Sequence, residues 1–346
     1  MRKFIVFISI LVLVTSFVFA AGDRETGEKK LVIGQVFWGL HDSYQQAHQK
    51  ATAEYLKELG INYLPMDGQM KPEAQTAAME DLIARGVDGI ICQAYDQASM
   101  EISIKAAQDA GIPVVSFVNI SSGDVKYPTV EISEEPGAVE MGKIIGKIFL
   151  ENFPGKQLKV ATISDASVEW AHNQRTLAFL RGLKETVPSM NHIFNGGKSN
   201  REEAYRVMED VMQRDKDVNV VFGYDAENGL GGYAALEAAG RGVAVNGKPL
   251  TEIVASVDGS TPEILKVADP RTSYMATLAL RPRQNARACV DLLLDVINGD
   301  MSMYETNKNV QVVSFVIDGN MSIADTEKFM KDEWDISIDI RKEIGL

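Results

Sequence analysis

The stretch MEDLIARGVDGIICQAYD, residues 79–96, combines the end of a helix, a turn, a buried strand and a polar loop. It recurs at residues 208–225 as MEDVMQRDKDVNVVFGYD, with MED and YD in register. A repeated plan of strand, loop and helix predicts two similar lobes in one chain. Residues directly after a parallel strand lie where open α/β sheets bind ligands, so the loops after the strands are the candidate site.

The segments around this repeat follow the same plan. Apolar runs rich in Val and Ile, such as residues 30–37, 112–117 and 252–257, alternate with helical patterns and short loops. This alternation is typical of parallel sheets with right-handed crossovers. The sequence therefore predicts an α/β fold of two similar lobes with parallel sheets. In the helix expected over 135–153, Gly142 and Gly146 lie on a face that allows close packing.

No linker separates the lobes, so their boundaries are expected at strand crossings near Ile132, Leu280 and Val310. The N-terminal lobe then comprises residues 31–132 plus 281–309. The C-terminal lobe comprises residues 133–280 plus 310–346, including a late strand over 310–317. A charged helical tail is expected over 326–346.

The first 21 residues are typical of an export leader. Arg2 and Lys3 precede an apolar run over residues 4–19, and Ala20 and Ala21 provide a small-residue cleavage site. The alternative is an uncleaved anchor helix. We expect a secreted, periplasmic or extracytoplasmic protein, in which the two cysteines, Cys92 and Cys289, are small buried side chains rather than a disulfide framework.

Charge and motifs exclude several classes of protein. The formal net charge is −13 and no Lys/Arg run is present, so nucleic acid is not an expected partner. The four histidines lack metal-site spacing, Cys-x-x-Cys is absent, and neither a nucleophile elbow nor a Walker loop occurs. The segment GLGGYA at residues 229–234 fits a dinucleotide fingerprint only loosely, because five residues separate it from the preceding strand. The sequence thus predicts no enzyme, cofactor or metal.

The side chains after the strands suit reversible binding of a small, neutral, polar molecule. The indole faces of Trp38 and Trp170 could cover the apolar face of a sugar. Carboxylates, amides and guanidinium groups could pair with its hydroxyls. The candidates of this second kind are Gln93, Asn119, Asn173, Arg175, Asp225, Asp258 and Arg281. Singly, each has a plainer interpretation, such as a packed Trp, a helix cap at Asp225 or a turn residue at Asp258.

The order of segments resembles the periplasmic sugar-binding proteins of the ribose-binding type, the solute receptors of ABC importers. The similarity covers roughly residues 31–325. The matching segments are LVIGQVFW, ARGVDGIICQAYD, AGIPVVSF, NQRTLAFLRGL, DVNVVFGYD, SVDGSTPEILK and the closing VIDGNMSIAD. The resemblance implies the type I fold of periplasmic binding proteins, with two Rossmann-like lobes, a hinge of three crossings and a ligand clamped between the lobes.

Carried over residue by residue, the resemblance implies sugar-binding roles for Arg175, Asp225, Asp258 and Tyr44. The chain departs from ribose binders in three places. His41, Asp42 and Ser43 stand where they have Asn-Pro-Phe, Val118-Asn119 replaces their Asp-Arg, and Leu280 beside Arg281 replaces a glutamine. These departures imply a rebuilt site, in which His41 and Asp42 are further candidate ligand contacts and which is open to a hexose, pentose, polyol or modified sugar.

The sequence thus favours an exported, monomeric receptor that closes on a carbohydrate and delivers it to an ABC transporter permease. The alternative is a module that presents a sugar or autoinducer to a chemoreceptor or sensor kinase. A sugar-responsive repressor is rejected, because a leader occupies the place of its DNA-binding headpiece. An exported enzyme has no visible nucleophile or metal site.

Overall fold

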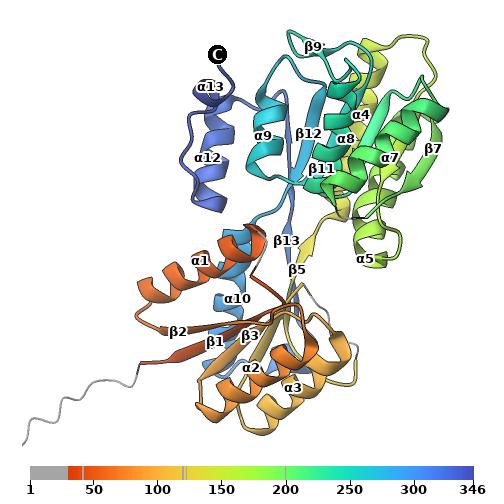
Figure 1. The fold of residues 1–346 in the computed structure, drawn as a ribbon. Coiled ribbons are helices and arrows are strands. Elements are labelled where there is room, and N and C mark those ends of the chain that lie inside the picture. The colour runs from red at the N-terminus through yellow and green to blue at the C-terminus, as the bar shows by residue number, and fades with distance from the viewer. Residues whose placement is uncertain (1–29, 41–42, 119–120, 122, 199) are drawn as a thin grey trace, which may run out of the picture. The chain divides into compact units, whose positions relative to one another are not determined.

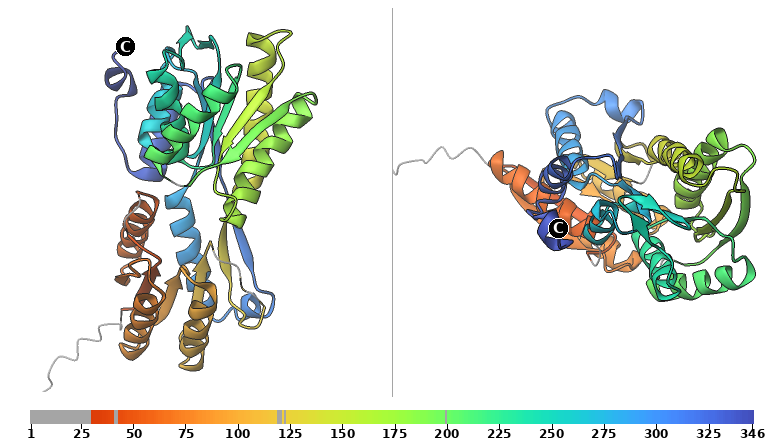
Figure 2. Two further views of the ribbon diagram at one scale, coloured as in Figure 1. Left: turned by 45° about the vertical axis from the view of Figure 1, so that its right-hand side comes forward. Right: turned by 90° about the horizontal axis from the view of Figure 1, so that it is seen from above.

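The computed structural model describes residues 30–40, 43–118, 121, 123–198 and 200–346. The expected leader therefore lies outside the described residues. Within them, two six-stranded sheets carry the fold, each covered by helices on both faces (Figures 1 and 2). We call the parts of the chain around these two sheets the first and second lobes. The described residues contain no helix that is long and apolar enough to cross a membrane.

The first lobe is built on a parallel sheet with the strand order β13-β5-β4-β3-β1-β2. Its strands are β1 (Val32–Phe37), β2 (Asn62–Asp67), β3 (Gly89–Cys92), β4 (Val114–Phe117), β5 (Thr129–Ser133) and β13 (Asn309–Val313). Its helices are α1 (Ser43–Glu58), α2 (Pro72–Ala84), α3 (Gln97–Asp109), α10 (Pro282–Ile297) and α11 (Ser302–Glu305). Apolar residues of α1 and α10 pack on one face and those of α2 and α3 on the other, which explains why the central strands are apolar throughout.

The second lobe repeats this arrangement with the order β14-β12-β11-β8-β6-β7. Its strands are β6 (Lys159–Ile163), β7 (Asn191–Gly196), β8 (Val220–Gly223), β11 (Ile253–Asp258), β12 (Tyr274–Ala279) and β14 (Phe315–Asp318). Its helical elements are α4 (Glu135–Asn152), α5 (Glu169–Ala171), the π-helix η1 (His172–Leu177), α6 (Ala178–Thr186), α7 (Arg201–Arg214), α8 (Ala226–Ala238), α9 (Thr261–Ala268), α12 (Ile323–Trp334) and α13 (Ile340–Glu343). A small hairpin of β9 (Ala244–Val245) and β10 (Lys248–Pro249) stands apart from the sheet.

The repeated sequence occupies equivalent positions in the two lobes. The buried side chains of Met79 in α2 and Met208 in α7 precede β3 and β8, which hold the same place in their sheets. Asp96 accepts a hydrogen bond from the Ser99 backbone N–H and caps α3, as Asp225 caps α8 through Asn228, each at 2.8 Å. The two-lobed α/β fold that the repeat predicts is confirmed.

Close helix packing is also confirmed where the sequence predicts it. A Cβ atom added at Gly142 in α4 would lie 2.2 Å from the carbonyl oxygen of Phe179 in α6, and one at Gly146 would lie 2.7 Å from Thr186 Cβ. Neither position has room for a side chain, so the two helices approach as closely as their backbones allow. The two cysteines are buried and free, as expected.

The prediction of a single late strand over residues 310–317 is wrong. This segment forms two strands in different sheets, because β13 pairs with β5 in the first lobe and β14 pairs with β12 in the second. The chain passes between the sheets at Ser314, so we place the third crossing there rather than at Val310. The β14 strand runs antiparallel to β12, an exception to the expected parallel pairing.

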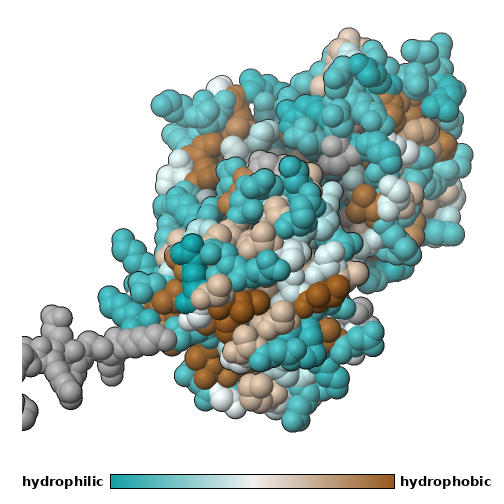
Figure 3. Space-filling view, turned by 60° about the horizontal axis from the view of Figure 1, so that its bottom comes forward, coloured by the Kyte–Doolittle hydropathy of each residue, from teal (hydrophilic) through white to brown (hydrophobic). Residues whose placement is uncertain are grey.

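An apolar surface marks the far edge of the first lobe. Most of the surface seen from this side is hydrophilic, and several apolar patches interrupt it (Figure 3). A cavity of about 530 Å³ is lined there by Leu31, Ile112, Pro113 and Met301, among others. Leu31 and Pro113 precede their strands, so this cavity lies at the edge opposite the strand ends where ligands are expected.

Candidate functional site

A cavity of about 750 Å³ is lined by residues of both lobes. It lies at the carboxyl ends of the strands, where the sequence predicts the site. Seven of the predicted residues line it, namely Trp38, Tyr44, Gln93, Trp170, Arg175, Asp225 and Asp258. The volume lies within the range of small-molecule sites.

The other five predicted residues fall into two groups. His41, Asp42 and Asn119 lie outside the described residues. Asn173 is exposed and is not part of the lining, although it lies in η1 with Arg175. The Arg281 guanidinium pairs with Glu333 of α12, with its Nε atom 2.9 Å from the carboxylate, and does not line the cavity.

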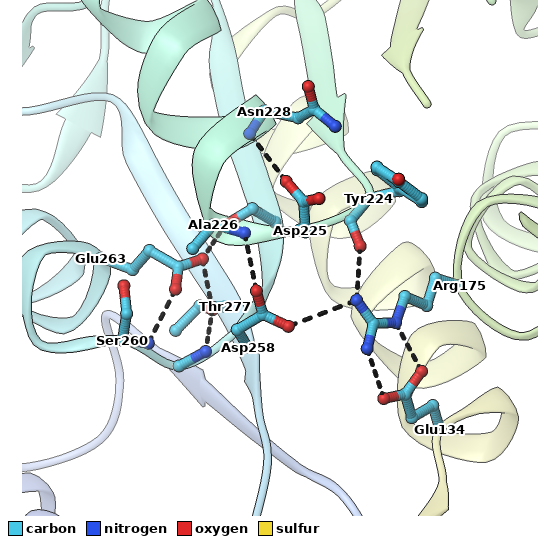
Figure 4. A network of polar contacts seen from close by, with 12 residues as sticks. Glu134, Arg175, Tyr224, Asp225, Ala226, Asn228, Asp258, Ser260, Glu263 and Thr277 are labelled. Atoms are coloured by element: carbon cyan, nitrogen blue, oxygen red, sulfur yellow. Dashed lines mark hydrogen bonds and ion pairs between the residues drawn. The ribbon is translucent and has the colours of Figure 1, made fainter. Parts of the chain in front are cut away.

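The Arg175 guanidinium is the centre of a polar network on the second lobe (Figure 4). Its Nε and Nη2 atoms donate to the two carboxylate oxygens of Glu134 at 2.6 and 2.8 Å. Its Nη1 atom donates to the Tyr224 carbonyl at 3.0 Å and to the Asp258 carboxylate at 3.2 Å. Burial alone would lower the pKa of Arg175, but the charges of Glu134 and Asp258 outweigh burial and raise it. The arginine therefore faces the cavity with its charge already compensated.

A change of helix geometry brings Arg175 to this position. The helical stretch that follows β6 is not uniformly α-helical, because η1 has π-helical geometry between α5 and α6. Such insertions frequently occur at functional sites, because they re-aim side chains without ending the helix. The Arg175 guanidinium also lies 6.0 Å from the centre of the Trp170 ring, which links an aromatic wall of the cavity to the network.

Asp258 is held in a strained turn at the end of β11. Its φ angle of 111° is rare for a residue other than glycine, and Gly259 follows with φ 69°. One carboxylate oxygen of Asp258 accepts from the Ala226 backbone N–H at 3.0 Å, and the other contacts Arg175. Burial raises the pKa of the Asp258 carboxyl, an effect that Arg175 opposes. Strain of this kind is maintained where the surrounding contacts determine the conformation, as they do here.

A buried carboxyl group supports this turn from behind. Glu263 of α9 accepts from the Ser260 backbone N–H at 2.7 Å and from Thr277 Oγ1 at 3.0 Å (Figure 4). Burial raises the pKa of Glu263 to about 7 although these donors favour its charged form. The turn that carries Asp258 is therefore fixed by side chains as well as by backbone strain.

Aromatic rings form the other walls of the cavity. Trp38 stacks on Tyr95, with ring centres 6.2 Å apart and planes within 13°. Tyr44 meets the edge of Trp334, with ring centres 6.4 Å apart. The three tryptophans of the sequence all line this cavity. Flat rings beside polar groups can bind a molecule that has both apolar faces and hydroxyls.

Sequence reasoning missed several residues of the lining. Among them are Gln45, Glu134, Arg201, Glu227, Ser260 and Trp334. Glu134 follows directly after β5, so the rule that selected the other strand-end residues could have found it. Trp334 ends α12, far from any strand end, and no local pattern indicates its place.

The arginines of the described lining are paired with carboxylates. Arg201 pairs with Glu227 at 2.9 Å, and Arg175 is paired with Glu134. Both arginines in the described lining are thus neutralised, and Asp225 and Asp258 add further carboxylates. Such a cavity offers hydrogen bonds without an excess of positive charge, which suits a neutral ligand better than an anion.

Comparison with known proteins agrees with this geometry. The family model described as periplasmic binding protein domain matches residues 33–301. The ribose import binding protein of Bacillus subtilis is 23% identical over 272 residues, covering 79% of this chain and 83% of the relative. The putative rhizopine-binding protein of Rhizobium meliloti is 27% identical over 248 residues, covering 70% and 75%.

Solved structures share the fold. A solute-binding protein of an ABC transporter from Actinobacillus succinogenes, with bound D-allose, has a TM-score of 0.69 at 21% identity, covering 84% of this chain and 98% of that one. Another from Bacillus halodurans, with bound myo-inositol, has a TM-score of 0.69 at 20% identity, covering 89% and 100%. Since the family model matches well over half of the chain, this protein belongs to the periplasmic binding protein family and is a solute-binding protein rather than an enzyme.

Proposed function

We propose that this protein is an extracytoplasmic receptor that clamps a neutral monosaccharide or polyol between its two lobes and delivers it to an ABC transporter permease. The observation that carries the proposal is the cavity, which combines aromatic walls with hydrogen-bonding groups and paired arginines. Ligand contacts to both lobes favour the closed arrangement, so binding and closure are coupled.

The relatives support the substrate class. Those named above are import or binding proteins for ribose and rhizopine, and the solved structures hold D-allose and myo-inositol. Sugars and cyclic polyols share a ring with apolar C–H faces and a rim of hydroxyls. Because the Bacillus subtilis relative is named for import and both solved structures are named as ABC transporter components, delivery to a permease is favoured over presentation to a chemoreceptor or sensor kinase.

The test is thermal unfolding of the mature protein against a panel of neutral sugars and polyols. The panel contains D-ribose, D-allose, L-arabinose, D-fructose and myo-inositol, with glucuronate and galacturonate as matched anionic controls. A ligand at a hundred times its dissociation constant adds about 2.7 kcal/mol to the free energy of unfolding. We expect one neutral compound to reach this value and the uronates to have no effect. A flat panel, or stronger stabilisation by a uronate, would contradict the proposal.

We also propose that the receptor is monomeric and that its first residues are an export leader, cleaved after Ala20 or Ala21. The mass of the protein recovered from the producing cell should then correspond to a chain that begins at residue 21 or 22. Light scattering should give the mass of one chain with and without ligand. A full-length mass in the membrane fraction would instead indicate an anchor helix.

A further inference from the structure

Helix α12, which precedes the last helix α13, reaches the cavity. It begins after the capping residue Ser322 and ends at Trp334, and Asp335 then takes a left-handed conformation with φ 53°. Trp334 lines the cavity and meets the ring of Tyr44 from the first lobe. The family model ends at residue 301, so α12 lies beyond the part of the chain that matches it.

Contacts on both sides of Trp334 hold it against the first lobe. The Glu333 carboxylate accepts from Arg281 Nε at 2.9 Å and from the Gln284 backbone N–H at 3.2 Å, at the start of α10. The Asp335 carboxylate accepts from Lys50 of α1 at 2.5 Å. Figure 1 shows this end of α12 directed toward α1 and α10. Both sequence neighbours of Trp334 are therefore bonded to first-lobe helices.

The rest of the C-terminal segment belongs to the core of the second lobe. Met330, Ile340 and Ile344 are buried there, beside Ile264 and Val267 of α9. The Ile340 backbone N–H donates to Glu327 of α12 at 2.9 Å. Because one end of the segment is anchored in the second lobe and Trp334 is held against the first, the position of this indole is defined by both lobes.

The Trp334 indole has a donor that finds no partner among the described residues. Its Nε1 atom is buried and makes no hydrogen bond within the described part of the chain. On the first-lobe wall of the same cavity, the buried Gln93 Oε1 atom also has no partner among the described residues. Buried polar groups are nearly always paired, and an unpaired donor is costly unless a ligand or water meets it.

We propose that Trp334 is a specificity-determining residue, whose Nε1–H donates to one hydroxyl oxygen of the bound sugar or polyol while its ring closes one wall of the site. This inference rests on the proposed function and assigns part of it to α12. The ligand acceptor would satisfy the unpaired indole donor, and a sugar that lacks the hydroxyl would leave that donor unpaired.

The test compares three variants with the wild type, using the compound that stabilises the wild type most and its monodeoxy analogues. Trp334→Phe keeps an aromatic ring and removes the donor, and Trp334→Ala removes both. The matched control is Phe329→Ala, which also removes a ring of α12, one that stacks on Phe315. Affinity is measured by calorimetry, and the unfolding midpoint without ligand is recorded for each variant.

We expect Trp334→Ala to weaken binding by at least about tenfold and Phe329→Ala to leave affinity unchanged. One deoxy analogue should bind the wild type about tenfold more weakly than the parent compound. Trp334→Phe should bind that analogue and the parent equally, because the lost donor and the lost hydroxyl are partners. A purely structural role for Trp334 cannot produce this selective loss of discrimination.

Two results would overturn the inference. Trp334→Phe could retain the wild-type discrimination against every deoxy analogue, or Trp334→Ala could bind as tightly as the wild type. In both cases the wild type still binds the compound, so the proposed function stands. Failure of the proposed function would appear in the wild-type panel itself and is thus distinguishable.

Discussion

Arg175 organises the site although its own positive charge is already paired with the carboxylates of Glu134 and Asp258. Its guanidinium joins Glu134, at the crossing after β5, to Asp258 at the end of β11 and to the backbone after β8. Three segments that are distant in sequence are thereby fixed around one cation. Its remaining contribution to a ligand is polar and directional rather than attraction of an anion.

Replacement of Arg175 should destabilise the protein strongly. Arg175→Met leaves the fully buried Glu134 carboxylate without its counterion, so we expect a loss of about 3–5 kcal/mol in the free energy of unfolding by urea. Adding Glu134→Gln should recover part of this loss, because it removes the unpaired charge. The control is Arg181→Met, which breaks an exposed pair with Glu135 and should cost less than about 1 kcal/mol. Equal losses for the two arginines would refute this account.

His48 should make stability depend on pH. It is fully buried in the first lobe, where its Nε2 atom lies 2.9 Å from Asn285 Oδ1, and burial lowers its pKa to about 4. Below pH 6.5 the His48 imidazole of the unfolded chain is protonated, whereas that of the folded chain stays neutral until the pH approaches 4. The stabilisation is complete above pH 6.5 and is lost as the pH falls toward 4, by about 3 kcal/mol.

The raised pKa of Glu263 changes the stability with pH in the opposite direction. The measurement is therefore the difference in the free energy of unfolding between the wild type and His48→Gln. In urea unfolding, the stability advantage of the wild type over His48→Gln should shrink by about 3 kcal/mol between pH 6.5 and pH 4. A difference that stays constant with pH would show that His48 is not the group responsible.

At the scale of elements, helix geometry positions the site residues. The π-helical turn of η1 aims Arg175 at the cavity, and the Asp225 cap places the start of α8 beside it. The close approach of α4 and α6 supports this part of the second lobe. A Cβ atom at Gly182 in α6 would lie 1.9 Å from the Val139 carbonyl oxygen of α4. Backbone meets backbone there, so no side-chain movement can make room.

Substitution at this contact should be costly although alanine favours helices. We expect Gly182→Ala to lower the free energy of unfolding by about 2–3 kcal/mol, because the helices must separate. Gly319→Ala is the matched control, since no heavy atom of the described residues lies within 4 Å of its added Cβ and its effect should stay within about 0.5 kcal/mol. Urea unfolding of both variants tests the prediction, and a neutral Gly182→Ala would contradict it.

At the scale of the whole described chain, the cavity needs both lobes. Trp38, Tyr44 and Gln93 come from the first lobe, and Trp170, Arg175, Asp225 and Asp258 come from the second. The chain passes between the sheets three times, after β5, after β12 and at Ser314. Three short connections restrict the motion of the lobes to a hinge and leave closure available to a ligand that contacts both.

Ligand binding should therefore protect both lobes at once. With a saturating sugar, we expect hydrogen exchange to slow in the segments after β1 and β3 and also in those after β8 and β11. The cavity at the far edge of the first lobe, around Ile112, provides an internal control whose exchange should not change. Protection confined to one lobe would contradict a clamp.

Much of the site could be predicted because its residues obey a local rule. Trp38 and Gln93 follow directly after buried strands, Asp225 comes two residues after β8, and parallel strands bring their carboxyl ends to one edge. Arg281 shows the limit of this rule, because its position after β12 is right but its side chain turns to Glu333 of α12. Which partner a charged side chain chooses depends on segments that are remote in sequence.

The sequence by itself determined the two-lobed α/β architecture, since the repeated stretch and the alternation of apolar strands with helices are local patterns that burial enforces. Tertiary structure alone decided the division of residues 310–317 between two sheets, because an apolar strand pairs with whichever edge is open to it. It alone also brought Trp334 to the cavity. The position of that indole depends on Glu333 and Asp335 meeting Arg281 and Lys50, and such long-range contacts leave no periodicity in the chain.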